Sequence, residues 1–227
     1  MTPPARPPQP HVPRTAFILA NTTPARPPLV PEITLQLATR ITPIWQATEE
    51  YLAQVNLAPP YWAFAWPGSQ AIARHIIDNP SFVTGRRVLD FAAGSGLAAI
   101  ACALSGAASV EAVDIDPLSA DATNLNAAAN AAAVTTTSGD IVGQPSRWDL
   151  ILCGDVCYEA PMTAHILPWL QQLAHSAEVW IADPGRAYLP EPSVIEFATY
   201  EVPTSLELEC QTARHTRLMR LLPGNPP

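Results

Sequence analysis

Beyond Gly85 the chain alternates short apolar runs with stretches of helical periodicity, and this alternation limits the fold more than any other feature. Strands are expected at 87–91, 109–114, 134–138, 148–154 and 178–183, and helices at 95–105, 117–131 and 161–174. Such alternation predicts an α/β fold with a mostly parallel sheet covered on both faces. Two further strands, 198–202 and 215–222, lack a strong helix between them and predict an antiparallel pair at the sheet edge.

The first 31 residues have a different composition. They contain ten prolines, whose missing N–H blocks regular hydrogen bonding, and three Arg without any acid. We therefore predict a disordered, proline-rich arm over 1–31, one domain over 32–223 and a flexible tail over 224–227. A cleaved targeting segment is not favoured, because the prolines break the amphipathic helix of a transit peptide and the apolar stretch 15–20 is too short for a secretory signal.

An aromatic stretch lies between the arm and the alternating region. The apolar spacing over 32–56 predicts helical segments interrupted at Pro43. The loop that follows, 59–68, reads PPYWAFAWPG and leads into a helix expected over 69–78. Trp66 in this loop either lines a cofactor site or only starts the helix.

The turn from the first strand of the alternating region to its helix is the candidate ligand loop. It reads VLDFAAGSGL over 88–97, and small residues there let backbone N–H groups and the positive end of the helix approach a ligand closely. A nucleotide-like cofactor binds over the strand ends at such a turn. Asp114 closes the next strand 20 residues after Gly94, the spacing at which an acid accepts hydrogen bonds from ribose hydroxyls.

Charge separates two cofactor classes for this loop. The spacing Gly94-x-Gly96-x-x-Ala99 also fits a dinucleotide loosely, but a dinucleotide carries an anionic pyrophosphate. Residues 88–146 contain six acids and no Arg, which disfavours phosphate and favours the cationic S-adenosylmethionine. Asp90 is placed to bind an ammonium group and Asp140 to reach an adenine amino group. The alternatives are a purely structural glycine turn, a helix N-cap for Asp116 and a plain turn at Asp140.

Overall charge and cysteine usage restrict the partners and the compartment. The net charge is −8, all 12 basic residues are Arg, and without the three Arg of the arm the charge is −11. Nucleic acid is therefore a poor partner, whereas a basic protein or a cationic small molecule fits. Four irregularly spaced cysteines predict a reducing compartment, the cytoplasm or, in a eukaryote, the mitochondrial matrix, and no metal site. No apolar stretch reaches membrane-spanning length.

Several motifs carry a resemblance to a known family. VLDxxxGxG at 88–96 followed by DIDP at 114–117 resembles the class I S-adenosylmethionine-dependent methyltransferases. PPYWA at 59–63, WPG at 66–68, GDVCY at 154–158 and DPGR at 183–186 are similar to the lysine methyltransferases of the electron transfer flavoprotein β subunit. The resemblance covers 32–223. It implies a seven-stranded, mostly parallel Rossmann-like sheet with an antiparallel edge strand, S-adenosylmethionine as cofactor, and a protein lysine, on that β subunit, as acceptor.

The resemblance also implies roles for single residues. Asp155-x-x-Tyr158 matches the acid-x-x-aromatic motif that this group places beside the target lysine, so Asp155 and Tyr158 are the candidate catalytic residues. Ala92 departs from the family by replacing the first glycine of the commonest cofactor loop, and Cys157 departs by lying inside the acceptor motif. The candidate cofactor contacts are the small residues of the loop, three acids and one aromatic residue: Asp90, Ala92, Gly94, Gly96, Asp114, Asp140 and Trp66.

An amine acceptor agrees with the chemistry of these residues. Methyl transfer from a sulfonium requires alignment of the reactants and exclusion of water, and the amine must be neutral. An aromatic wall of Trp62, Trp66 and Tyr158 is expected to lower the pKa of the amine by desolvation, while Asp155 holds and orients it. The alternatives are an N-methyltransferase for a ribosomal protein or a small amine, a non-catalytic binding module, and an NAD-dependent dehydrogenase.

Overall fold

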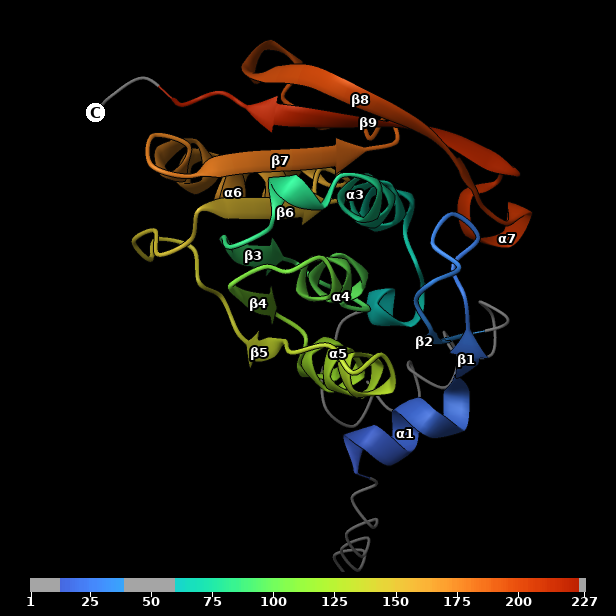
Figure 1. The fold of residues 1–227 in the computed structure, drawn as a ribbon. Coiled ribbons are helices and arrows are strands. Elements are labelled where there is room, and N and C mark those ends of the chain that lie inside the picture. Colours follow the sequence, from blue (N-terminus) through green and yellow to red (C-terminus); the bar gives the residue numbers. More distant parts are fainter. Residues whose placement is uncertain (1–12, 39–59, 225–227) are drawn as a thin grey trace, which may run out of the picture.

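A seven-stranded sheet forms the centre of the computed structural model, which describes residues 13–38 and 60–224 (Figure 1). Its strand order is β5-β4-β3-β6-β7-β9-β8. The strands are β3 (Arg87–Phe91), β4 (Ser109–Asp114), β5 (Thr135–Ser138), β6 (Leu150–Gly154), β7 (Glu178–Asp183), β8 (Val194–Pro203) and β9 (Ala213–Leu221). The predicted strands are all present, and those at 87–91, 109–114 and 178–183 have the expected bounds.

The pairing of the strands confirms the mostly parallel sheet. β3 pairs in parallel with β4 and β6, and the pairs β4–β5 and β6–β7 are also parallel. β9 is antiparallel to its neighbours and lies between β7 and the edge strand β8. Only the short α7 (Leu206–Glu209) lies between β8 and β9, so the chain returns in the opposite direction, as expected for this edge of the sheet.

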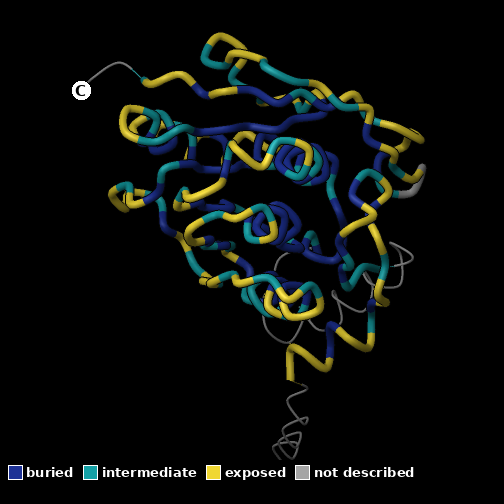
Figure 2. Tube along the Cα trace, viewed as in Figure 1, coloured by how far each residue is buried: buried dark blue, intermediate teal, exposed yellow. Residues whose placement is uncertain are grey.

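Helices cover both faces of the sheet, and the strands therefore feed two hydrophobic cores. α3 (Pro67–Asp78), α4 (Leu97–Leu104) and α5 (Pro117–Ala129) lie on one face, and α6 (Ala160–Leu173) lies on the other (Figure 1). Val88 of β3 packs in the core of α3 and α4, whereas Leu89 packs in the core of α6. Figure 2 shows buried residues along the strands and on the helix sides that face them. The four helices predicted in this region are confirmed.

The N-terminal segment differs from the predicted disordered arm. Its described part forms α1 (Arg14–Asn21) and β1 (Thr23–Ala25), and Phe17 and Ile18 of α1 are buried against Trp62 and Leu118. The predicted disorder rested on the proline content of all 31 residues. The stretch 14–21 contains no proline and presents two large apolar side chains to the domain. From residue 13 onward this segment is therefore part of the fold, whereas residues 1–12 lie outside the described residues.

The helix predicted from residue 32 is also corrected where the structure describes it. Here β2 (Leu35–Leu37) pairs antiparallel with β1. Ile33 and Leu35 are buried, as their apolar character suggested, but the chain around them is extended because β1 offers a pairing edge. The remainder of the predicted helical region, 39–56, lies outside the described residues, as do 225–227 of the predicted tail.

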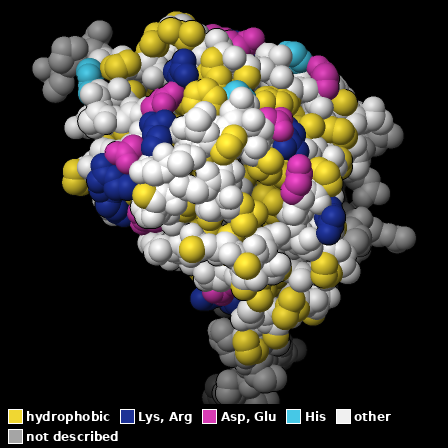
Figure 3. Space-filling view, in the orientation of Figure 1, with side chains coloured by type: hydrophobic (Ala, Val, Ile, Leu, Met, Phe, Trp, Pro, Cys, Tyr) yellow, Lys and Arg dark blue, Asp and Glu magenta, His cyan; other side chains and the backbone are white. Residues whose placement is uncertain are grey.

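Three short 3-10 helices complete the described elements: η1 (Tyr61–Ala63), η2 (Pro80–Phe82) and η3 (Glu191–Ser193). Within the described ranges no helix has the length and apolar character needed to cross a membrane. On the face drawn in Figure 3, Arg side chains lie beside acidic ones at several places. The ion pairs of Arg74 with Asp78 and Glu32 are examples of such mixed surface charge.

Candidate active site

The candidate cofactor loop joins β3 to α4 through residues in the left-handed backbone region. Ala92, Gly94 and Gly96 all have positive φ, at 56°, 55° and 77°. A side chain at Gly94 would meet only the Tyr61 carbonyl oxygen, 3.9 Å away, so this part of the loop is open to an approaching ligand. At Gly96 a Cβ would lie 2.5 Å from the Thr123 Cγ2 atom, so glycine is required there for α5 to pack against the loop.

Asp114 lies at the end of β4, beside this loop. Its Oδ2 atom accepts the Gly94 N–H at 2.9 Å, and its Oδ1 atom accepts the Asp116 N–H at 3.0 Å. The structure therefore brings the predicted ribose-binding acid to the glycine loop. Asp116 caps α5 by accepting the Leu118 N–H, which confirms the N-cap alternative for that residue. Burial raises the pKa of Asp116 to about 6.

Asp90 is buried beneath the first turn of α4. Its Oδ2 atom accepts the Ala99 N–H at 2.9 Å, so the carboxylate binds one of the free donors at the helix N-terminus. Burial raises the pKa of Asp90 to about 7, and the neighbouring Asp114 acts in the same direction. This anchoring role was not expected from the sequence; the contact with a ligand ammonium stays a prediction.

Asp140 lies apart from these acids, on the exposed loop after β5. Its two carboxylate oxygens contact the Val142 N–H and His165 Nε2 on α6, at 2.9 and 2.8 Å. The Val142 N–H and then His165 lower the pKa of Asp140 below its ordinary value. The plain turn at Asp140 is therefore present, and a contact with adenine stays a prediction.

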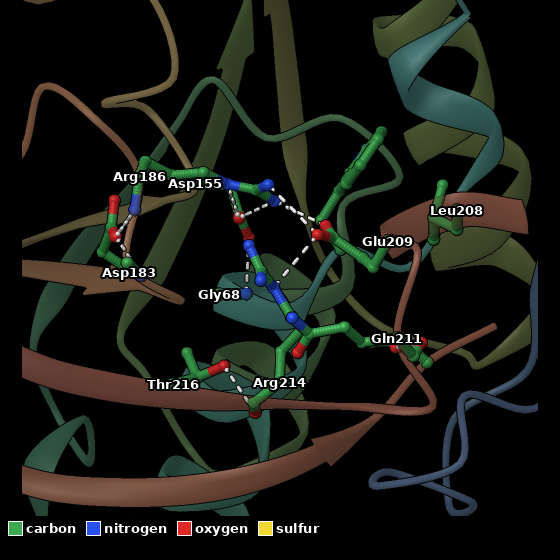
Figure 4. A network of polar contacts seen from close by, with 12 residues as sticks. Gly68, Asp155, Asp183, Arg186, Leu208, Glu209, Gln211, Arg214 and Thr216 are labelled. Atoms are coloured by element: carbon green, nitrogen blue, oxygen red, sulfur yellow. Dashed lines mark hydrogen bonds and ion pairs between the residues drawn. The ribbon is translucent and has the colours of Figure 1, made fainter. Parts of the chain in front are cut away.

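Asp155, directly after β6, is held in a buried network of charged residues (Figure 4). Its Oδ2 atom accepts the Gly68 N–H at the start of α3, and its Oδ1 atom accepts Arg186 Nε and Nη2 at 3.0 and 2.6 Å. Burial raises the pKa of Asp155 to about 6, and the charge of Arg186 opposes that rise. Both carboxylate oxygens therefore have hydrogen-bond partners, which the sequence did not predict.

Arg186 connects Asp155 to α7. Its guanidinium also donates to both carboxylate oxygens of Glu209, at 2.6 and 3.1 Å, and Arg214 Nε lies 3.2 Å from the same carboxylate. Asp183 accepts the backbone N–H groups of Gly185 and Arg186, which fixes the turn that carries Arg186. The motif DPGR indicated Arg186, but no local pattern indicated Glu209, because its partners come from other parts of the chain.

An aromatic cluster lies between the cofactor loop and Asp155. Tyr61 contacts Trp66 and Tyr158, with ring centroids 5.8 and 5.5 Å apart, and the Trp66 indole N–H donates to the Tyr61 carbonyl at 2.8 Å. Arg186 lies 5.9 Å from the Trp66 ring centroid. Trp66 and Tyr158 therefore both pack against Tyr61, a residue that the sequence did not predict for this wall. Trp62 was expected in this wall, but it is buried against Phe17 of α1.

Cys157 is buried, and its thiol does not face solvent as a reactive group would. Burial raises the pKa of this thiol to about 12, so Cys157 is neutral at physiological pH. Within the described residues no three His, Cys, Asp or Glu side chains gather as metal ligands. The acceptor region therefore relies on the charged network of Asp155, Arg186 and Glu209 and on the tyrosines beside it.

Comparisons with known proteins show which families this chain is similar to. The family model of ribosomal protein L11 methyltransferase (PrmA) matches residues 75–156. The electron transfer flavoprotein beta subunit lysine methyltransferase of Danio rerio is 39% identical over 189 residues, which covers 80% of this chain and 72% of the relative. The Xenopus laevis protein of that name is 38% identical over 184 residues, covering 79% and 74%.

Solved structures show the same fold at lower identity. The ribosomal protein L11 methylase of Lactobacillus delbrueckii subsp. bulgaricus superposes with a TM-score of 0.50 at 23% identity, covering 71% of this chain and 81% of that one. A Thermoplasma acidophilum protein superposes with a TM-score of 0.53 at 15% identity, covering 70% and 89%. These similarities establish the fold alone.

Proposed function

Because the chain belongs to the family of electron transfer flavoprotein beta subunit lysine methyltransferases, we propose that it methylates a lysine of that subunit. Membership makes it an S-adenosylmethionine-dependent methyltransferase. The observation that carries the proposal is the meeting of two sites at one end of the sheet: a glycine loop with its acid, and an aromatic cluster beside Asp155.

The cofactor loop fits S-adenosylmethionine in space and in charge. The loop is open above Gly94, and Asp114 lies beside it with no Arg in the whole stretch 88–146. The residues that would hold the cofactor are Gly94, Gly96, Asp114 and Trp66, with Asp90 bracing the loop from below. When bound, S-adenosylmethionine supplies a methyl group activated by its positively charged sulfur.

The acceptor side is suited to an amine that has lost its proton. Free lysine has a pKa of about 10.4, so the site must favour the neutral amine. Tyr61, Trp66 and Tyr158 offer an apolar surface that disfavours the charged form by desolvation, and Tyr158 is 38% exposed, so it lies within reach of a protein substrate. The aromatic cluster thus supports both the alignment and the deprotonation of a lysine side chain.

Asp155 supports alignment more than proton removal. Both of its oxygens are already engaged, one with Gly68 and one with Arg186, so its position and charge are fixed before a substrate arrives. A fixed carboxylate attracts the incoming ammonium and then orients the neutral amine, and the released proton leaves to water. Preorganised groups of this kind act without reorganising during the reaction.

The match to the L11 methyltransferase family model supports the methyl-donor site, but it does not distinguish one methyl acceptor from another. It spans 75–156, from the end of α3 to two residues beyond β6, and therefore includes the cofactor loop and Asp155 but neither Trp66 nor Tyr158. A ribosomal protein or a small amine remains the second candidate acceptor on this basis. For the compartment we propose the cytoplasm, or the mitochondrial matrix in a eukaryote, which four free cysteines support.

The test mixes the purified full chain with methyl-labelled S-adenosylmethionine and, separately, purified electron transfer flavoprotein, ribosomal protein L11 and a set of small amines. Label on a lysine of the flavoprotein β subunit is the expected result. Label only on L11 or on a small amine would overturn the acceptor assignment.

A calorimetric titration with S-adenosylhomocysteine, the demethylated product, completes the test of the function. Heat of binding is expected, and its absence would favour a non-catalytic module. Asp155→Asn should lower turnover about 100-fold while the affinity for the cofactor product is kept, since misalignment of reactants costs about that much. A fully active variant would remove Asp155 from the acceptor site.

A further inference from the structure

One face of α5 carries buried polar side chains that none of the roles above explains. Ser119, Thr123 and Asn126 follow one another at helical spacings of four and three, and each is at most 2% exposed. Buried polar groups are costly unless they are hydrogen-bonded, so their partners indicate what they hold in place.

All three side chains hold carbonyl groups of the cofactor loop. Ser119 Oγ donates to the Gly94 carbonyl at 2.7 Å, and Thr123 Oγ1 donates to the same oxygen at 3.3 Å. Asn126 Nδ2 donates to the Ser95 carbonyl at 2.8 Å. Because these carbonyls point into the protein, the loop between β3 and α4 is held in one orientation from below.

Asn126 differs from the other two because it has a second partner outside the loop. Its Oδ1 atom accepts the Gln36 N–H of β2 at 2.7 Å. Residues 34–38, which we call the strap, run alongside α5. One turn beyond Asn126, the Asn130 amide accepts the Thr34 N–H at 2.9 Å and donates to the Thr34 carbonyl at 2.6 Å. At its far end the Ala38 N–H donates to the Ala63 carbonyl of η1 at 2.9 Å, next to the aromatic cluster.

We propose that Asn126 is a positioning residue that holds the cofactor loop in its ligand-binding conformation. A single fully buried amide joins the Ser95 carbonyl of the loop to the Gln36 N–H of the strap. The Gln36 N–H fixes which way the amide faces, so its Nδ2 atom stays turned toward the Ser95 carbonyl. The inference rests on the proposed function, because it concerns binding at the cofactor loop.

Asn126→Ala tests the anchor directly, with S-adenosylhomocysteine as the probe in calorimetric titrations of the full chain. It leaves the Ser95 carbonyl and the Gln36 N–H without side-chain partners, and we expect binding about tenfold weaker than in the unchanged protein. Asn130→Ala is the matched control, because it removes two strap contacts but touches no loop atom. Its affinity should stay within about twofold of the unchanged protein.

Asn126→Asp supplies a readout that a general loss of stability would not move. Protonated aspartic acid can still donate to the Ser95 carbonyl, whereas the ionised carboxylate repels it. The ratio of variant to unchanged dissociation constant should therefore be near one at low pH and rise about tenfold as the buried acid ionises. The ratio also removes the contribution of other charged or titratable groups, because they are present in both proteins. On the neighbouring elements these groups are Asp90, Cys102, Asp114, Asp116, Asp121 and Arg14.

The outcomes separate this inference from the proposed function. An unchanged protein that binds no S-adenosylhomocysteine contradicts the function itself. A protein that binds it equally well after Asn126→Ala, or a ratio for Asn126→Asp that does not change with pH, overturns the positioning role. An Asn130→Ala variant that loses as much affinity as Asn126→Ala would also overturn it, because the effect would then belong to the strap's fold and not to the anchor. Thermal unfolding of each variant establishes that the titrated protein is folded.

Discussion

The two sides of the active site are built from chain segments of very different separation. The candidate cofactor loop and its supports come from one continuous region, 87–126, in which the loop, Asp90, Asp114 and the buried face of α5 follow one another. The acceptor side joins Gly68, Asp155, Arg186 and Glu209 from four separate regions (Figure 4). A destabilising substitution near the cofactor loop should therefore be compensated by a second substitution close to it in the chain. The acceptor side depends on charges that only the complete fold brings together.

Arg186→Met should give the largest effect, because it leaves Asp155 and Glu209 as buried acids without their shared cation. Removing one member of a buried ion pair costs about 3–5 kcal/mol of unfolding free energy. The pKa of Asp155, already raised to about 6, should rise further above its value of about 3.9 in the unfolded chain. The folded state then binds more protons, so the variant should lose stability as pH rises from about 4 through the folded pKa.

Chemical denaturation of this variant at pH 5 and pH 8 measures both effects. Arg217→Met is the matched control, since Arg217 pairs with the exposed Glu191 and Glu196 and should cost less than about 1 kcal/mol. Equal losses in the two variants, or a loss for Arg186→Met that does not grow with pH, would contradict the special role given to the acceptor network.

Two glycine substitutions compare the sides directly. A Cβ at Gly68 would lie 2.7 Å from the Ala182 carbonyl oxygen and from the Asp155 backbone nitrogen, whereas a Cβ at Gly96 would meet the side chain of Thr123. Each alanine substitution should cost about 1–3 kcal/mol by overpacking. Thr123→Ala should recover part of the loss in Gly96→Ala, because the blocking group is then gone.

The positive φ of Gly96 still leaves a residual cost after that repair. No side-chain substitution can remove the backbone atoms beside Gly68, so Ser69→Ala, chosen as a neighbouring truncation, should give no recovery in Gly68→Ala. Thermal unfolding of the single and double variants measures these differences. Equal recovery on both sides would break the distinction between local and long-range construction.

Asp114→Asn should weaken the binding of S-adenosylhomocysteine about tenfold or more, with little change in stability. The asparagine side chain has a single accepting oxygen, so it cannot serve the Gly94 and Asp116 N–H groups together with the ligand. Calorimetric titration is the measurement, and Asp121→Asn, on the exposed side of α5, is the control. An affinity equal to that of the unchanged protein would remove Asp114 from the cofactor site.

Ala92→Gly should have the smallest effect and the opposite sign. Alanine at a φ of 56° carries about 1–2 kcal/mol of strain, which glycine avoids, while glycine costs about 0.5–1 kcal/mol in the entropy of the unfolded chain. The net gain in unfolding free energy should be about 0.5 kcal/mol, measured by denaturant titration. A loss of stability would mean that the Ala92 methyl group contributes more packing than its strain costs.

The strands, helices and turn around the candidate cofactor loop were predictable from the sequence because their signals are local. Alternating apolar runs fixed β3, α4, β4 and α5, and the spacing from Gly94 to Asp114 placed an acid at the loop. The prediction for Trp62 was wrong for the opposite reason, because a run of aromatic residues does not indicate which ring is buried. Trp62 packs against Phe17, which comes from the distant N-terminal segment. The same segment is predicted to be disordered because its prolines outnumber its large apolar side chains.

From the amino-acid order alone came the parallel α/β sheet, its antiparallel edge pair, the glycine turn and the acid beside it, because each depends on neighbours within one strand–helix unit. Only the tertiary structure decided the partners of Asp155 and Asn126. Arg186, Glu209 and Gln36 reach them from distant segments, and hydrogen bonds and ion pairs of that kind leave no periodic trace in a sequence. They form because burial removes water as a competing partner once the sheet and its helices have closed around them.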